Sequence, residues 1–148
     1  MLPRKAASPG SMTSTHSGSP LPVAAAVANI RELKRGGYIE NARALGPVLR
    51  EGLQAIQQRY PRNAGCVNAR GLVAGIQMVR PGTRVPDPGT ALAVNEACFR
   101  RGLLMFAPVG VAGECIKIAP ALGISREALE EGIQTIGDAM EAVLNGGG

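Results

Sequence analysis

The chain has 148 residues, 45% of them apolar and only 3% aromatic, which is enough for one domain with an aliphatic core. Its net charge of +5 comes from basic residues that are scattered rather than clustered, so a dedicated nucleic-acid-binding role is disfavoured. Three widely spaced cysteines and a single histidine offer neither a disulfide framework nor a metal site, and no apolar run is long enough to span a membrane. We therefore expect a cytoplasmic protein with reduced thiols and with no metal, membrane or nucleic-acid partner.

The chain begins with a leader, residues 1–11, whose two prolines and small residues predict an irregular and mobile segment. A polar stretch, Met12–Pro20, follows it and holds five hydroxyl side chains and His16 directly ahead of a helix. Hydroxyls and the free N–H groups of a starting helix together form a suitable site for an anion. The alternative interpretation is that these residues only cap the helix.

Two helices are predicted next. The first begins in the sequence Pro-Leu-Pro at residues 20–22, carries apolar residues on one face, and ends at Gly36-Gly37. The second extends over Ile39–Arg59, and Pro61 stops it. Pro47 lies inside this second pattern, where proline costs about 3 kcal/mol in a straight helix. We therefore expect either a kink at this position or two shorter helices.

The second half of the chain alternates between strand and helix patterns. The order expected is a strand, a helix that Asp87-Pro88 begins, two short strands, and a final helix that Ser125 caps. This pattern predicts an α+β fold, with two leading helices and then a β-α-β-β-α unit whose helices cover one face of a three-stranded sheet. The expected strands are Gly71–Val79, Leu103–Ala107 and Cys115–Ala119.

Four stretches of the chain, taken in order, resemble the class III aminotransferases, the ornithine and 4-aminobutyrate type of pyridoxal-phosphate enzyme. The family has a Thr-x-x-Gly-Asn-Pro motif before an Ala/Val-rich helix, an Arg-Gly-x-Gly-Leu motif at the start of a strand, and an Ile-Arg-Ile-x-Pro-Pro-Leu motif before the last helix. Each motif alone is weak, whereas four in the same order are specific. The four stretches are Ser14–Leu21, Asn68–Ile76, Arg101–Leu104 and Ile116–Ile124.

The resemblance implies two binding roles. Thr15, with Ser14 and His16 beside it, matches the loop that contacts the cofactor phosphate of the neighbouring subunit; His16 is interpreted as a loop residue and not as a general base. Lys117 matches a position that is often arginine and that binds the substrate carboxylate. A lysine supplies a point charge instead of a planar fork, so it would orient a carboxylate less well. The alternative for Lys117 is an exposed strand residue paired with Glu114.

The catalytic groups of the family have no counterpart among these residues. The family needs a lysine that forms a Schiff base with the cofactor and an aspartate that pairs with the pyridinium nitrogen. The lysines of this chain are Lys5, Lys34 and Lys117, and its aspartates are Asp87 and Asp138. None has the sequence context of the family's catalytic residues, so no catalytic residue is assigned and the chain alone is expected to be inactive.

The resemblance therefore implies the C-terminal part of a homodimeric or larger homo-oligomeric aminotransferase. Such an enzyme uses pyridoxal 5'-phosphate to transfer an amino group from an amino acid or amine to a 2-oxo acid. In this interpretation residues 1–11 are the leader, 12–62 are the phosphate loop and the connecting helices, and 63–145 are the small C-terminal domain. Two alternatives stay open: a non-catalytic module for dimerisation or another interaction, and a gene fragment without an independent function.

Overall fold

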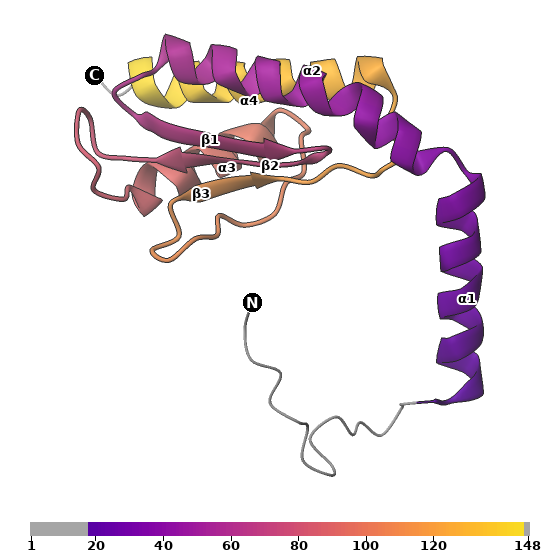
Figure 1. Cartoon of the computed structure of the whole chain (residues 1–148). Helices are drawn as coiled ribbons and strands as arrows, with labels where there is room; N and C mark the ends of the chain where they lie inside the picture. The colour runs from indigo at the N-terminus through magenta and orange to yellow at the C-terminus, as the bar shows by residue number, and fades with distance from the viewer. Residues whose placement is uncertain (1–17, 147–148) are drawn as a thin grey trace, which may run out of the picture. The chain divides into compact units, whose positions relative to one another are not determined.

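The computed structural model describes residues 18–146 of the chain (Figure 1). The chain divides into two compact units, one ending at Gly36 and the other comprising Gly37–Gly148. The elements are α1 (Pro20–Arg35), α2 (Tyr38–Arg59), β1 (Ala64–Arg70), β2 (Val73–Met78), α3 (Pro88–Arg100), β3 (Cys115–Ile118) and α4 (Arg126–Asn145).

Helix α1 confirms the first predicted helix, with Pro20 in its first turn and Gly36 after its last. The Gly36 N–H donates to the Glu32 carbonyl at 2.8 Å and closes the end of the helix. Ser19 occupies the N-cap position, but its side chain makes no capping hydrogen bond. No residue of α1 is buried within its own unit, so its apolar face stays uncovered there.

Helix α2 runs without interruption from Tyr38 to Arg59, so the expectation of two shorter helices is wrong. Pro47 cannot donate to the carbonyl of Arg43, one turn before it. Both residues lie on the exposed side of the helix, where water can hydrate that carbonyl. The opposite side is buried and forms the predicted apolar stripe: Leu45, Leu49, Leu53 and Ile56.

The sheet of the second unit is antiparallel, with the order β1-β2-β3. Side chains alternate between its faces, so Ile76 and Ile116 are buried on the inner face while Lys117 is on the outer face. Helices α2 and α4 pack against each other along the inner face (Figure 1), and α3 contacts α4, β2 and β3. The predicted α+β class and three-stranded sheet are confirmed.

The predicted order of elements in the second half, β-α-β-β-α, is wrong, because the observed order is β-β-α-β-α. The missed strand is β1, a run of small and polar residues without an alternating apolar pattern. It forms because Gly71, at φ +55°, turns the chain so that β1 can pair with β2. The expected strand Leu103–Ala107 is not a strand, since it pairs with no other segment of the described chain.

The predicted caps of the last two helices are confirmed. The Thr90 N–H donates to the Asp87 carboxylate at 3.0 Å, and the Thr90 hydroxyl donates to its other oxygen at 2.7 Å. At α4, the Ala128 N–H donates to the Ser125 hydroxyl oxygen at 3.2 Å. These bonds satisfy helix N–H groups that have no partner within the helix and fix where α3 and α4 begin.

Candidate functional site

Lys117 lies in the middle of β3, and the register of the sheet determines its neighbours. Ile116 and Ile118 point into the core, so Lys117 points outward. Across the sheet Lys117 pairs with Gly75, which in turn pairs with Asn68. The lysine therefore stands beside a position without a side chain, on the face of the sheet opposite to Ile76 and Ile116.

The side chain of Lys117 contacts an aromatic ring and not an acid. Its Nζ atom lies 4.7 Å from the centre of the Phe106 ring, within the range of a cation–π contact. Glu114 is buried, and its carboxylate accepts a hydrogen bond from the Ala112 N–H at 2.9 Å. Among the described residues Lys117 forms no ion pair, so the alternative pairing with Glu114 is wrong. Sequence reasoning missed Phe106 because nothing local links it to a lysine eleven positions later.

A shallow depression lies on the outer face of the sheet, and Gly75 is one of the residues that line it. A side chain at Gly75 would meet the Cys115 Sγ, since a Cβ there would lie 2.7 Å from it. The lining contains two cationic side chains and no acidic one, so the depression favours an anion. The lining residues are Asn68, Ala69, Arg70, Val73, Ala74, Gly75, Gln77, Cys115 and Lys117.

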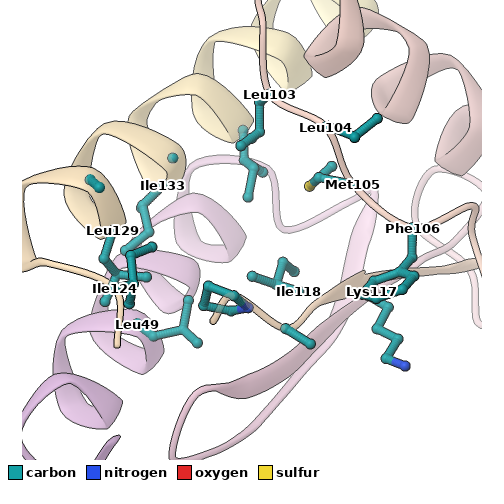
Figure 2. Close-up of a pocket in the computed structure, with 15 residues that line it drawn as sticks. Leu49, Leu103, Leu104, Met105, Phe106, Lys117, Ile118, Ile124, Leu129 and Ile133 are labelled. Carbon is teal, nitrogen blue, oxygen red and sulfur yellow. The ribbon is translucent and has the colours of Figure 1, made fainter. Parts of the chain in front are cut away.

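An apolar groove of about 390 Å³ lies on the other side of Lys117, and we call it the α4 groove (Figure 2). In Figure 2 the amine of Lys117 points away from Leu49, Leu129 and Ile133 of the groove. Lys117 therefore separates an apolar surface from a cationic one. The groove is lined by Leu49, Leu103–Phe106, Lys117–Pro120, Ile124, Ala128, Leu129, Gly132, Ile133 and Ile136.

The thiols of this unit show no sign of activation. Burial raises the pKa of the Cys98 thiol to about 11, and burial together with the nearby Glu114 charge raises the pKa of Cys115. A reactive cysteine needs the opposite shift, because the thiolate is the nucleophile. All three cysteines are free, and they act here as ordinary packing or surface residues.

The predicted phosphate-binding residues Ser14, Thr15 and His16 lie outside the described residues. Their binding role therefore stays a prediction. Within residues 18–146 no cluster of histidine, cysteine or acidic side chains could hold a metal ion. None of the helices in that range has both the length and the apolar character needed to cross a bilayer.

Comparison with known proteins identifies relatives over almost the whole chain. The family model of the class III aminotransferases matches residues 3–140. An isoleucine 2-epimerase of Lentilactobacillus buchneri is 32% identical over 133 residues, which are 89% of this chain and 29% of that protein. A 4-aminobutyrate aminotransferase of Mycobacterium tuberculosis is 31% identical over 127 residues, or 86% of this chain and 28% of the relative.

Solved structures give the same result. A transaminase from the marine bacterium Virgibacillus matches with a TM-score of 0.79 and 26% sequence identity. The match covers 92% of this chain and 31% of the transaminase. A phospholyase from Arthrobacter, solved in complex with phosphoethanolamine, matches with a TM-score of 0.76 and 29% sequence identity. This match covers 83% of this chain and 29% of the phospholyase. The 148 residues thus correspond to less than a third of each of these proteins.

Proposed function

The chain belongs to the class III aminotransferase family, and we propose that it supplies the C-terminal portion of such an enzyme and is inactive in amino-group transfer by itself. The observation that carries the proposal is the match over residues 3–140 combined with a coverage of 28% of the aminotransferase relative. The reaction we propose for the complete enzyme is transfer of an amino group from an amino acid or amine to a 2-oxo acid. The named relatives also include an epimerase and a phospholyase, so the family alone does not dictate the reaction.

Pyridoxal phosphate is the cofactor of this family, and the described residues do not form a complete site for it. Lys34 is exposed on α1, and Lys117 is held against the Phe106 ring. The Asp87 carboxylate is engaged by Thr90, and the Asp138 carboxylate accepts a hydrogen bond from Gln134 at 2.8 Å. No lysine and aspartate therefore face each other across a cavity in this range, and no chemical step is assigned to the described residues.

We propose that the polar stretch Met12–Pro20 helps to bind the cofactor phosphate of a neighbouring subunit in a homodimer or larger homo-oligomer. In this proposal Thr15 is the main hydrogen-bond donor, and Ser14 and His16 lie beside it in the sequence. The start of α1 at Pro20 supports this proposal, because the loop then leads directly into the first turn of a 16-residue helix. The N–H groups of a first helical turn carry partial positive charge and favour a phosphate dianion.

We propose that Lys117 attracts the substrate carboxylate. Its outward position and the lack of acidic side chains in the adjoining depression support this role. The Phe106 ring restrains the ammonium, which partly replaces the orientation that the fork of an arginine would provide.

We assign residues 12–62 to the end of the cofactor domain of the complete enzyme and residues 63–145 to its small C-terminal domain. The three free cysteines agree with a reducing compartment, and we propose the cytoplasm.

A second candidate function is a non-catalytic interaction module. The observation in its favour is that the large apolar side chains of α1 are exposed within their unit; Ile30, for example, is 53% exposed. Uncovered apolar faces promote self-association or binding of a partner. Size-exclusion chromatography with light scattering separates the candidates, because a monomer at high concentration contradicts the module.

The proposed function is tested by complementation. The Mycobacterium tuberculosis relative is produced without the segment that matches this chain, and it is refolded with pyridoxal phosphate and either its own segment or this chain. Partial recovery of amino-group transfer with this chain supports the proposal. Recovery with the relative's own segment but none with this chain contradicts it.

A further inference from the structure

The solvent side of α3 carries large apolar side chains where a surface helix normally carries polar ones. Phe99 is 67% exposed, and Leu92, two turns earlier on the same side, is 50% exposed. Phe99 is one of only two phenylalanines in the chain, and it stays uncovered within the described structure. Aromatic side chains exposed in this way are enriched where a partner binds.

The turn after α3 places a hollow beside Phe99. Gly102 has φ +85°, and the N–H of the residue after it donates to the Cys98 carbonyl at 3.0 Å, so the chain folds back at the end of the helix. Leu104 and Met105 thereby line a pocket of about 260 Å³ together with the last two turns of α3. The pocket residues of α3 are Asn95, Glu96, Phe99 and Arg100. The surface therefore has a projecting ring with a hollow directly beside it.

Two opposite charges lie next to Phe99 on the same side of α3. Glu96 and Arg100 are one turn apart, and both side chains are more than half exposed. Their contact within the helix is long, at 3.9 Å, and exposed pairs of this kind are weak, so both charges can take other partners. Because the two charges cancel, they give no net attraction to a nucleic acid or to an anionic membrane.

A second copy of the same surface, related by a two-fold axis, complements these features. In two antiparallel α3 helices that cross at the level of Cys98, the Glu96 of each copy faces the Arg100 of the other, because both residues are two positions from the crossing point. Phe99 then lies about 1.5 Å along the helix from the axis, where it meets the other copy's Phe99 and the hollow beside it. Each contact occurs twice, as a two-fold interface requires.

We propose that two copies of this chain bind each other through the α3 surface, which comprises Leu92, Glu96, Phe99, Arg100 and Leu104. The two α3 helices are antiparallel in this contact, and the two Phe99 rings are at its centre. The inference does not rest on the proposed function, so failure of the complementation leaves it standing. It also differs from the interaction module above, whose contact lies on α1.

The first test measures self-association of the complete 148-residue chain by sedimentation equilibrium. Phe99→Asp should raise the dissociation constant of the dimer by about tenfold or more, because it places an unpaired charge at the centre of the contact. The matched control is Val111→Asp, since Val111 is fully exposed but lies outside the α3 surface. This control should leave the dissociation constant unchanged.

The second test reverses charges. Glu96→Arg leaves two positive charges on the α3 surface and Arg100→Glu leaves two negative ones, so each variant alone should dimerise about tenfold less tightly than the unmodified chain. An equimolar mixture of the two variants should form a heterodimer about as tightly as the unmodified chain forms its dimer, because every positive charge then faces a negative one. Native mass spectrometry distinguishes the heterodimer from the two homodimers.

Three results contradict the inference. One is an unmodified chain that stays monomeric at about 1 mM. Another is self-association that Phe99→Asp does not weaken but Ile30→Asp abolishes, which places the contact on α1. The third is a mixture of Glu96→Arg and Arg100→Glu that associates no more tightly than either variant alone.

Discussion

Gly46 provides a sharp test of how α2 packs on the sheet. This residue is buried at the point where α2 crosses the turn between β1 and β2. A Cβ at Gly46 would lie 2.9 Å from the Cα atom of Gly71 and 3.3 Å from its carbonyl carbon and oxygen. Because these are backbone atoms, no rotation of a side chain can relieve the contact, and α2 or the turn must shift.

The expected effect of Gly46→Ala is the difference between two terms. Alanine stabilises a helix interior by about 1 kcal/mol relative to glycine. Overpacking against a rigid neighbour costs about 1–3 kcal/mol, and the backbone contact favours the upper part of that range. We therefore expect Gly46→Ala to lower the free energy of unfolding by about 1–2 kcal/mol, which is large against a typical total of about 5–15 kcal/mol.

The matched control is Gly132→Ala in α4. A Cβ at Gly132 would lie 3.8 Å from the Leu103 Cδ1, an ordinary van der Waals distance. This substitution should raise the free energy of unfolding by about 0.5–1 kcal/mol, the helix-propensity term alone. Urea denaturation followed by circular dichroism measures both variants. A Gly46→Ala protein as stable as Gly132→Ala would refute the close approach of α2 to the Gly71 turn.

Three further predictions concern the core, a cap and a thiol. Leu53 is fully buried, so Leu53→Ala should lower the free energy of unfolding by about 2–5 kcal/mol in urea denaturation, and a loss below about 1 kcal/mol is incompatible with its position. Asp87→Ala should lower the free energy of unfolding by about 1 kcal/mol at neutral pH, because it removes the cap of α3. The Thr90 N–H holds the pKa of Asp87 below its usual value of 3.8, so the carboxylate stabilises the fold when it is charged. The difference in stability between the variant and the unmodified chain should therefore shrink as the pH falls below 3.8. Cys98, with a pKa of about 11, should resist a thiol reagent at pH values near 8 until the chain unfolds, and labelling of the folded chain as fast as at Cys66 would contradict its burial.

The helices could be predicted from the sequence because their signals are local. Proline in the first turn, the capping residues Asp87 and Ser125, and the glycine after α1 each act within one turn of the helix. Pro47 shows the limit of such rules. Its cost depends on whether the carbonyl of Arg43 reaches water, which only the packed structure shows.

The strands were predicted less well because pairing is not local. β1 has a weak pattern of its own and becomes a strand because Gly71 brings it beside β2. Leu103–Ala107 has the better pattern and pairs with nothing in the described chain.

The candidate site was predicted only in part. Alternation along β3 placed Lys117 on the outer face, but its contact with Phe106 depends on how the segment before β3 returns to the sheet. The α4 groove was not predicted, because it is formed by α2, α4 and two extended segments that are distant in sequence. The phosphate-binding role of Thr15 remains a prediction.

The central claim is that this chain contributes to an aminotransferase without carrying its catalytic lysine. The most direct measurement is to incubate the 148-residue chain with pyridoxal phosphate, reduce with borohydride, and locate any cofactor–lysine adduct by peptide mass spectrometry. We expect no stoichiometric adduct at Lys5, Lys34 or Lys117 and no amino-group transfer. One adduct per chain at a single lysine, together with turnover of an amino donor and a 2-oxo acid, would contradict the claim.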